Sequence, residues 1–277
     1  MEDLLNNINI IGIGNDTSID LKRTSFYLTI DNSLFLFECN EDTFRYIQKH
    51  RELEEYDHWI IYISSLSEEH CNGLVRTVSL LYSKQINITI ISNKKIKSYL
   101  KIMKPKMKDV VNIINLKKED LSIMDKHTVD ISSYDMQKGI LFTLDRKNIF
   151  AYIDKITVNN IREFKQNKIQ YLIASFSPKW YKNNITFHKA INIIEADNLN
   201  RLIILNWENK NEIKETVYYL LDILRKDNMQ LDILLRLIKV VNSQSQVFGE
   251  YLLNEIEKRL NINIEDLNIK NLDIKEK

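Results

Sequence analysis

Apolar and polar residues change their spacing repeatedly along the chain, which indicates that strands and helices alternate. Residues 59–64 form a largely apolar run typical of a buried strand, and residues 86–91 are rich in the β-branched side chains that strands favour. Near residue 190, in contrast, apolar positions recur three and four residues apart, as on one face of a helix. The pattern predicts strands at residues 9–13, 25–30, 34–38, 59–64, 86–91, 128–132, 139–144, 148–153, 169–176 and 201–206, and helices at 41–50, 68–83 and 186–197.

The chain after residue 210 is predicted to be helical. Residues 229–243 carry two apolar stripes on opposite sides, so a helix there needs cover on both sides. That cover is either a partner, such as a second copy in a homodimer, or the packing of the main domain against the helices that follow. We expect an α/β domain over residues 1–210 and a C-terminal helical extension and tail over residues 211–277. The stripes are Leu231, Leu234, Leu235, Ile238 and Val241; then Ile233, Leu237 and Val240; and, in a later amphipathic helix, Phe248, Tyr251, Leu252, Ile256 and Leu260.

The composition is typical of a globular protein in a reducing compartment. Hydrophobic residues make up 44% of the 277 residues, and no apolar run approaches the roughly 20 residues of a membrane span. Two cysteines cannot form a disulfide framework, and residues 1–7 resemble no secretory or transit signal. We therefore expect a cytoplasmic protein, or one of an organellar stroma. Abundant Ile, Asn and Lys suggest an AT-rich genome, such as that of a plastid, a phage or a low-GC bacterium.

Lysines gather in one segment, although the net charge of only +1 excludes a basic surface over the whole protein. Between residues 94 and 108, seven of fifteen residues are lysines and none is acidic, with Tyr99 among them. Such a cluster can follow a nucleic-acid backbone, because each ammonium group neutralises a phosphate. A solvated helix face in a lysine-rich chain is the alternative. The lysines that would bind RNA are Lys94, Lys95, Lys97, Lys101, Lys104, Lys106 and Lys108.

Two segments resemble a known family. Residues 61–74, IYISSLSEEHCNGL, are similar to the I-T-H-x-H-x-D-H-x-x-G-L segment of the metallo-β-lactamase fold, in which a strand leads through a loop into a helix. Residues 36–47, LFECNEDTFRYI, resemble the L-F-D-C-G-E-G-T-Q-R-Q-I signature of ribonuclease Z, the tRNA 3′-processing endonuclease of that fold.

Further matches follow in the same order over residues 9–210. Residues 11–14 and 23–25 resemble the opening L-G-T-G…R-N-x-S-S, and residues 150–154 resemble the strand that ends in G-D-T. Residues 185–187 with 201–207 are similar to H-S-T…R-L-I-L-T-H. The resemblance implies a four-layer αββα metallo-β-lactamase sandwich, here extended by C-terminal helices, and an ancestry in tRNA maturation or related phosphodiester hydrolysis.

The family's chemistry, as the resemblance implies it, uses two zinc ions held by imidazole and carboxylate groups, which activate water and clamp the phosphate. At the H-x-H positions this chain has Ser65 and Ser67, and Met136 and Trp207 stand at two further histidine positions. None of these four side chains is a good zinc ligand at neutral pH. The ligand positions that keep a metal-binding side chain are those of Glu69, His70 and Asp154.

We therefore predict a relative that has lost most zinc ligands, needs no cofactor and acts without catalysis. It would bind RNA, such as tRNA, through the lysines, or a protein partner through the C-terminal helices. The alternative is a tRNA 3′-processing endonuclease or other phosphodiesterase with a remodelled site that holds one zinc ion. Cys39 and Cys71 flank the former metal loops and would share a metal or redox role, or serve as small buried side chains.

Glycine is scarce in this chain. It has five glycines, where average usage gives about 19. In the D-C-G-E-G-T loop of the family, the two glycines are Asn40 and Asp42 here. Because glycine lets the backbone pass close to a neighbour, we expect that close backbone approach is no longer required at this loop.

Overall fold

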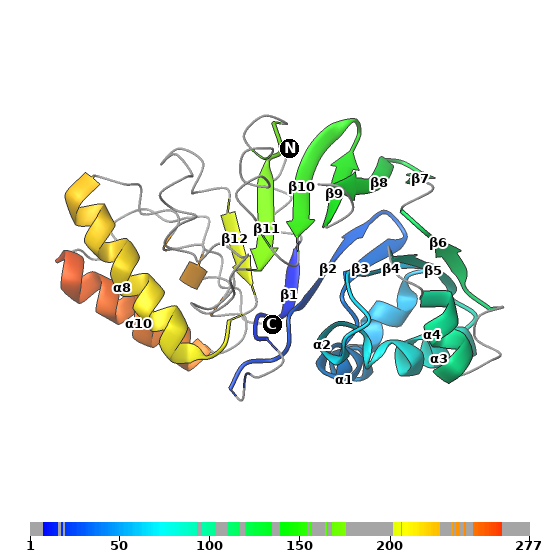
Figure 1. The fold of residues 1–277 in the computed structure, drawn as a ribbon, viewed down its shortest axis with the longest axis horizontal. Coiled ribbons are helices and arrows are strands. Elements are labelled where there is room, and N and C mark those ends of the chain that lie inside the picture. Colours follow the sequence, from blue (N-terminus) through cyan, green and yellow to red (C-terminus); the bar gives the residue numbers. More distant parts are fainter. Residues whose placement is uncertain are drawn as a thin grey trace.

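The computed structural model contains two β-sheets that face each other, with helices on their outer sides (Figure 1). The residues that the structure describes are 8–15, 18, 20–92, 96–103, 110–116, 120–134, 139–153, 156, 164, 168–175, 202–205, 207–227, 234, 237–238, 241 and 246–261.

The first sheet follows the order of the sequence. The first three strands are antiparallel neighbours, and the third to the sixth strands are parallel neighbours. Parallel neighbours need a crossover connection, which is usually a helix. The strands are β1 (Asn9–Gly12), β2 (Ser25–Ile30), β3 (Ser33–Phe37), β4 (His58–Ile63), β5 (Asn87–Ser92) and β6 (Asn112–Ile114).

The second sheet is built from the rest of the described strands, in the order β12-β11-β10-β9-β8-β7. An antiparallel meander runs from β7 to β10, and β11 and β12 continue it in parallel. Its strands are β7 (Leu121–Met124), β8 (Thr128–Tyr134), β9 (Gly139–Leu144), β10 (Lys147–Ile153), β11 (Tyr171–Ser175) and β12 (Leu202–Leu205).

Aromatic rings fill the space between the sheets. Phe26 stacks on Phe37 of the first sheet with ring centroids 4.4 Å apart, and Phe142 stacks on Phe150 of the second sheet at 4.9 Å. Phe37 also meets Phe150 edge to face at 5.4 Å, which joins the two sheets. Because burial of apolar surface is the main stabilising contribution in a folded chain, this layer fixes the two sheets relative to each other.

Helices cover the outer faces of the sandwich. On the first sheet lie α1 (Glu41–Lys49), the 3₁₀ helix η2 (Arg51–Glu55), α3 (Leu74–Ser83) and α4 (Ile96–Met103), which share one apolar cluster with the strands. Beside the second sheet lie α8 (Lys210–Asp227) and α10 (Gln246–Leu260), whose apolar faces belong to the cluster that includes β10 to β12 (Figure 1). The predicted four-layer αββα sandwich is confirmed. None of the described helices is long and apolar enough to cross a membrane.

The ten predicted strands are present, with bounds shifted by at most two residues. The apolar pattern does not predict β6, β7 or α4. The single helix predicted over residues 68–83 is wrong: α2 (Glu68–Cys71) and α3 are separated at Asn72 and Gly73. The break has a cause, because the Asn72 side chain accepts a hydrogen bond from the Glu41 amide and the Gly73 amide donates to the Cys39 carbonyl. The helix predicted over residues 186–197 lies outside the described residues.

The segment 229–243 contributes to the core of this chain. Leu234, Ile238 and Val241 of its first stripe and Leu237 of its second are buried, and all four belong to the cluster of the second sheet. Of the two alternatives for this segment, packing within the chain is therefore favoured. In α10, Leu252 and Ile256 are buried as the later stripe predicts. The boundary at residue 210 stays a prediction.

Three turns from both sheets meet around His127. Its main-chain N–H donates to Asp31 in the β2–β3 turn, and its Nδ1 lies 2.9 Å from Asp145 in the β9–β10 turn. Asp145 also accepts a hydrogen bond from the Thr128 amide at 2.9 Å. Exposed polar groups thus join turns of the two sheets.

We expect this contact to make stability depend on pH. The hydrogen bond and charge of Asp145 raise the pKa of His127 above its ordinary value of 6.5. A group whose pKa is raised by folding stabilises the protein fully below its unfolded pKa, and the contribution is lost as pH rises through the folded value. His127→Ala should therefore lower the urea midpoint at pH 5.5 and leave it nearly unchanged at pH 9. Lys49→Ala, at an exposed position of α1, is the control, and an equal loss at both pH values would contradict the assignment.

Candidate functional site

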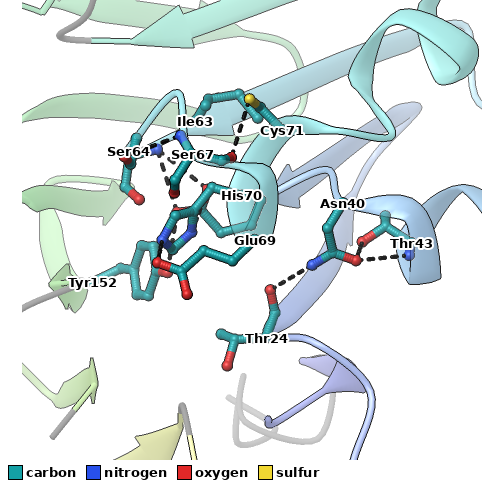
Figure 2. Close-up of polar contacts among 12 residues, drawn as sticks. Thr24, Asn40, Thr43, Ile63, Ser64, Ser67, Glu69, His70, Cys71 and Tyr152 are labelled. Carbon is teal, nitrogen blue, oxygen red and sulfur yellow. Dashed lines mark hydrogen bonds and ion pairs between the residues drawn. The ribbon is translucent and has the colours of Figure 1, made fainter. Parts of the chain in front are cut away.

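The segment that resembles the family's metal loop lies where β4 ends at the carboxyl edge of the parallel strands. We call residues 64–73 the 64–73 loop. Within it the amides of His70 and Cys71 both donate to the Ser67 carbonyl at 3.1 Å, which forms the single turn of α2. Figure 2 shows Ser64, Ser67 and His70 gathered near Tyr152 of the second sheet. In α/β folds this edge of a parallel sheet is where ligand sites are usually found.

Glu38, which directly follows β3, is fully buried and has φ of 63°, in the left-handed region that side chains other than glycine rarely adopt. Along β3, Leu36 belongs to the helix-covered cluster and Phe37 to the layer between the sheets. Regular alternation would therefore turn residue 38 toward the helices. The left-handed backbone interrupts this alternation, and the carboxylate instead meets Tyr152 from the opposite sheet.

Three groups surround the Glu38 carboxylate. The Ser64 amide donates to both of its oxygens at 3.3 Å, and the Tyr152 hydroxyl donates to Oε1 at 3.1 Å. His70 Nδ1 lies 3.2 Å from Oε2. A buried carboxylate is costly unless it is hydrogen-bonded or paired, and here it has both kinds of partner. Glu38 thereby connects β3, the 64–73 loop and β10.

His70 lies between two carboxylates and is 2% exposed. Its Nδ1 faces Glu38, and its Nε2 is 2.9 Å from Glu69 Oε1. A carboxylate at one ring nitrogen is the usual outer partner of a histidine whose other nitrogen binds a metal ion. The contact of Nδ1 with Glu38 therefore orients the ring, and Nε2 and Glu69 form the pair that would share a single ion.

Ser65 and Trp207, at two further predicted ligand positions, are not good zinc ligands. The Ser65 hydroxyl accepts a hydrogen bond from the Ser67 amide at 3.3 Å. Trp207 is buried, and its indole N–H donates to the Ile204 carbonyl at 3.3 Å. Two members of the predicted set, Met136 and Asp154, lie outside the described residues.

The two cysteines are buried and unbridged near this loop. The Cys39 thiol donates to Thr77 Oγ1 at 3.3 Å, and the Cys71 thiol donates to the Ser67 carbonyl at 3.3 Å. Burial raises the pKa of Cys39 to about 12 and raises that of Cys71 as well. Since the thiolate is the reactive and metal-binding form, these pKa shifts favour two small buried side chains.

The two-zinc site that the resemblance implies does not fit these side chains. Hydroxyl and indole groups occupy positions where the resemblance implies imidazoles. Within the described part of the chain, no group of three or more His, Cys, Asp or Glu side chains is arranged to hold a metal ion. What this arrangement does provide is a buried ionic network that binds the loop to both sheets.

Glu38 and Tyr152 are the site residues that the sequence analysis did not single out. For Glu38 the sequence carried a signal, because the L-F-D-C-G-E-G-T signature has Asp at the position where this chain has the longer Glu38. For Tyr152 no signal existed, since its hydroxyl contact depends on how two sheets distant in the sequence face each other.

The lysine segment 94–108 begins with α4. Ile96 and Leu100 of this helix are buried, whereas Lys101 and Ile102 are exposed. The helix therefore presents its polar side to solvent at Lys101. Lys97 also lies in α4, although only its backbone is described, and Lys94, Lys95, Lys104, Lys106 and Lys108 lie outside the described residues.

The expectation of no close backbone approach near Asn40 is wrong. A Cβ atom at Gly73 would lie 2.1 Å from the Asn40 carbonyl oxygen, so only glycine fits there. The family's glycine position is filled by Asn40, whose side chain accepts from the Thr43 amide at 3.1 Å and donates to the Thr24 carbonyl at 3.0 Å (Figure 2). The close contact is thus kept, with its glycine on the 64–73 loop.

Comparison with solved structures gives several chains of the same architecture. The short form of human tRNase Z matches 72% of this chain and 92% of its own, with a TM-score of 0.53 and 13% identity. The metallo-β-lactamase fold protein YhfI from Bacillus subtilis matches 72% and 85%, with a TM-score of 0.51 and 13% identity. A diphosphatase from the PhnP family matches 73% and 95%, with a TM-score of 0.50 and 11% identity. No protein-family model and no curated protein matches the sequence.

We expect Gly73→Ala to destabilise the fold. The added methyl group would collide with the Asn40 backbone, and overpacking of this kind costs about 1–3 kcal/mol. Thermal unfolding should show a melting temperature several degrees lower. Tyr82→Ala, at a position 55% exposed on α3, is the control and should change it little. An unchanged melting temperature for Gly73→Ala would contradict the close approach.

Proposed function

We propose that this chain, which has the metallo-β-lactamase fold, acts by binding RNA and does not hydrolyse it. The observation that carries the proposal is that Ser65, Ser67 and Trp207 stand at positions where the resemblance implies imidazole ligands. Hydrolysis in the manner of this fold's two-zinc enzymes needs a metal-bound water, and the metal needs bare imidazole nitrogens. His70 alone keeps an imidazole at a ligand position.

RNA is favoured over a protein partner for a reason of surface chemistry. The hypothesis of a protein partner depended on uncovered apolar stripes in residues 229–243, and both stripes have members buried within this chain. In the lysine segment 94–108, in contrast, seven of the fifteen residues are lysines and none is acidic. Lys101 of this segment is exposed on α4. Since one of the structural matches is a tRNase Z, tRNA is the first RNA to use as a probe.

A second candidate is a phosphodiesterase with a single metal ion held by Glu69, His70 and Asp154. One observation favours it: β10 ends at Ile153, and Tyr152 of this strand reaches the same carboxylate that contacts His70. Asp154 follows this strand end in the sequence. In this candidate Nε2 of His70 and Glu69 would hold the ion together with Asp154, and Glu38 would orient the ring through Nδ1.

Metal analysis separates these two candidates. We expect the purified protein to contain far less than one zinc ion per chain and to leave a tRNA precursor uncleaved when zinc is added. His70→Ala should then change neither property. Stoichiometric zinc with precursor cleavage, both abolished by His70→Ala, would overturn the proposal and establish the second candidate.

Replacement of lysines tests the RNA surface. Lys97, Lys101 and Lys104 changed together to Gln should weaken tRNA binding by about tenfold or more at low salt, because each phosphate contact releases counterions. The slope of log affinity against log salt should also become shallower. Fluorescence anisotropy with labelled tRNA measures both.

The control is a second triple variant with the same change in charge. Lys22, Lys49 and Lys126 are exposed lysines outside the segment, and their change to Gln should leave the affinity nearly intact. Equal losses in the two variants would show non-specific attraction and contradict the assignment. A chain that retains no tRNA at low salt but forms a stable complex with another protein would replace RNA by a protein partner.

A further inference from the structure

We propose that one face of the C-terminal helices α8 and α10 binds unpaired nucleotides of RNA, with aromatic rings for the bases and cationic groups for the phosphates. The inference rests on the proposed function, because it adds to an RNA-binding chain a second contact whose chemistry differs from that of the lysine segment. We call this surface the aromatic face. Its members are Lys210, Lys214, Tyr218, Phe248, Tyr251 and Arg259.

The lysines of the aromatic face lie over rings of the neighbouring helix. Lys214 Nζ on α8 is 5.0 Å from the ring centroid of Tyr251 on α10, and Lys210 Nζ is 5.6 Å from that of Phe248. A cation over a ring is attracted to its electron-rich face, which holds a long side chain that would otherwise move freely. The charges are therefore partly ordered in advance, and binding a phosphate costs less side-chain entropy.

The third cation is Arg259, whose Cζ lies 3.7 Å from the ring centroid of Tyr218. The carboxylate next to these groups is that of Glu255. It accepts a hydrogen bond from the Tyr218 hydroxyl at 2.9 Å and lies 3.9 Å from Arg259 Nε. Three cationic side chains thus share the aromatic face with one carboxylate, so the face has an excess of positive charge that suits a phosphate.

The rings of the aromatic face are open to solvent in part. Tyr251 is 38% exposed, and Tyr218 and Phe248 are half-buried. The planes of Phe248 and Tyr251 differ by 12°, with centroids 6.2 Å apart, so a flat base that stacks on one ring is aligned with both. Exposed aromatic rings among cations are the features with which proteins bind single-stranded nucleic acid.

Carboxylates beside the aromatic face make an unpaired strand the favoured ligand. Glu215 of α8 and Glu250 of α10 are exposed, so the two helices are not basic as a whole and attract a phosphate backbone only weakly. Stacking of bases on the rings must therefore supply a large share of the affinity. A duplex keeps its bases paired and stacked on each other, and only an unpaired strand can place them on Tyr251 and Phe248.

The aromatic face lies far from the lysine segment. Figure 1 shows α8 and α10 at one end of the molecule and α4, where the lysine segment begins, at the other. An RNA that uses both surfaces has to extend along the whole molecule. A short single strand can occupy only one of them at a time, so it tests the aromatic face separately.

A labelled oligouridylate of about twelve nucleotides is the probe, because single-strand sites of this kind cover 4–16 nucleotides. Tyr251→Ala should weaken its binding about fivefold or more, since a base loses its stacking partner. Tyr251→Phe keeps the ring and should retain the affinity. A duplex of the same length should bind more weakly than the single strand. Fluorescence anisotropy measures all of these affinities.

The chain offers a matched control in Tyr82, an exposed tyrosine on α3. Tyr82→Ala should leave the affinity for the oligouridylate unchanged. The variant in which Lys97, Lys101 and Lys104 are Gln should still bind the single strand, and Tyr251→Ala in that background should weaken binding further. Equal affinities for wild type and Tyr251→Ala, or equal losses in Tyr251→Ala and Tyr82→Ala, would overturn the inference.

Photo-crosslinking of the wild-type chain keeps the inference testable if a variant fails to fold. An oligouridylate that contains 4-thiouridine should crosslink to peptides of α8 and α10, which mass spectrometry identifies. Crosslinks confined to residues 94–108 would refute only this inference and leave the proposed function in place. A wild-type chain that binds neither tRNA nor the oligouridylate at low salt would refute the proposed function.

Discussion

The structure depends at its centre on the need to satisfy one buried negative charge. The carboxylate of Glu38 lies in the apolar layer between two sheets, where water cannot solvate it, and the Ser64 amide and the Tyr152 hydroxyl donate to it. Satisfying this charge fixes the loop that follows β4, occupies one nitrogen of His70 and ties β3 to a tyrosine of the opposite sheet. The same contacts that stabilise the fold thus also orient the histidine that best matches a metal ligand.

The strands could be predicted from the sequence because they lie in apolar or alternating runs. A run such as residues 59–64 is apolar on both faces, which indicates a buried strand. The arrangement of the strands in a sandwich was predicted from the order of the family-like motifs. The elements that escaped prediction are short or interrupted. β6 has three residues, and β7 alternates between half-buried and exposed positions at an edge. The helix over 68–83 is divided by hydrogen bonds from another segment, and local periodicity carries no information about those.

The candidate site was predicted in part. The serines at positions 65 and 67 and the tryptophan at 207 could be recognised as poor ligands from chemistry alone. That Glu69 and His70 lie in contact agrees with their expected closeness. The central role of Glu38 could not be predicted, because strand alternation assigns it to the wrong face of the sheet and only its left-handed backbone reverses that. The expectation that no close backbone approach occurs near Asn40 was wrong for a related reason. A close contact between two backbone segments needs glycine in only one of them, and here Gly73 supplies it opposite Asn40.

Trp207 has a consequence for how the sandwich avoids self-association. Its main-chain N–H donates to the Ile13 carbonyl at 2.7 Å, and its carbonyl accepts from the Asn15 amide at 2.9 Å. These bonds join the chain just after β1 to the chain just after β12, which are the first edges of the two sheets. Edge strands are where folded chains can pair with one another, and these bonds occupy backbone groups just beyond the ends of β1 and β12. The opposite edges are β6 and β7, and β7 carries Met124 at 81% exposure, so intermolecular strand pairing would begin there.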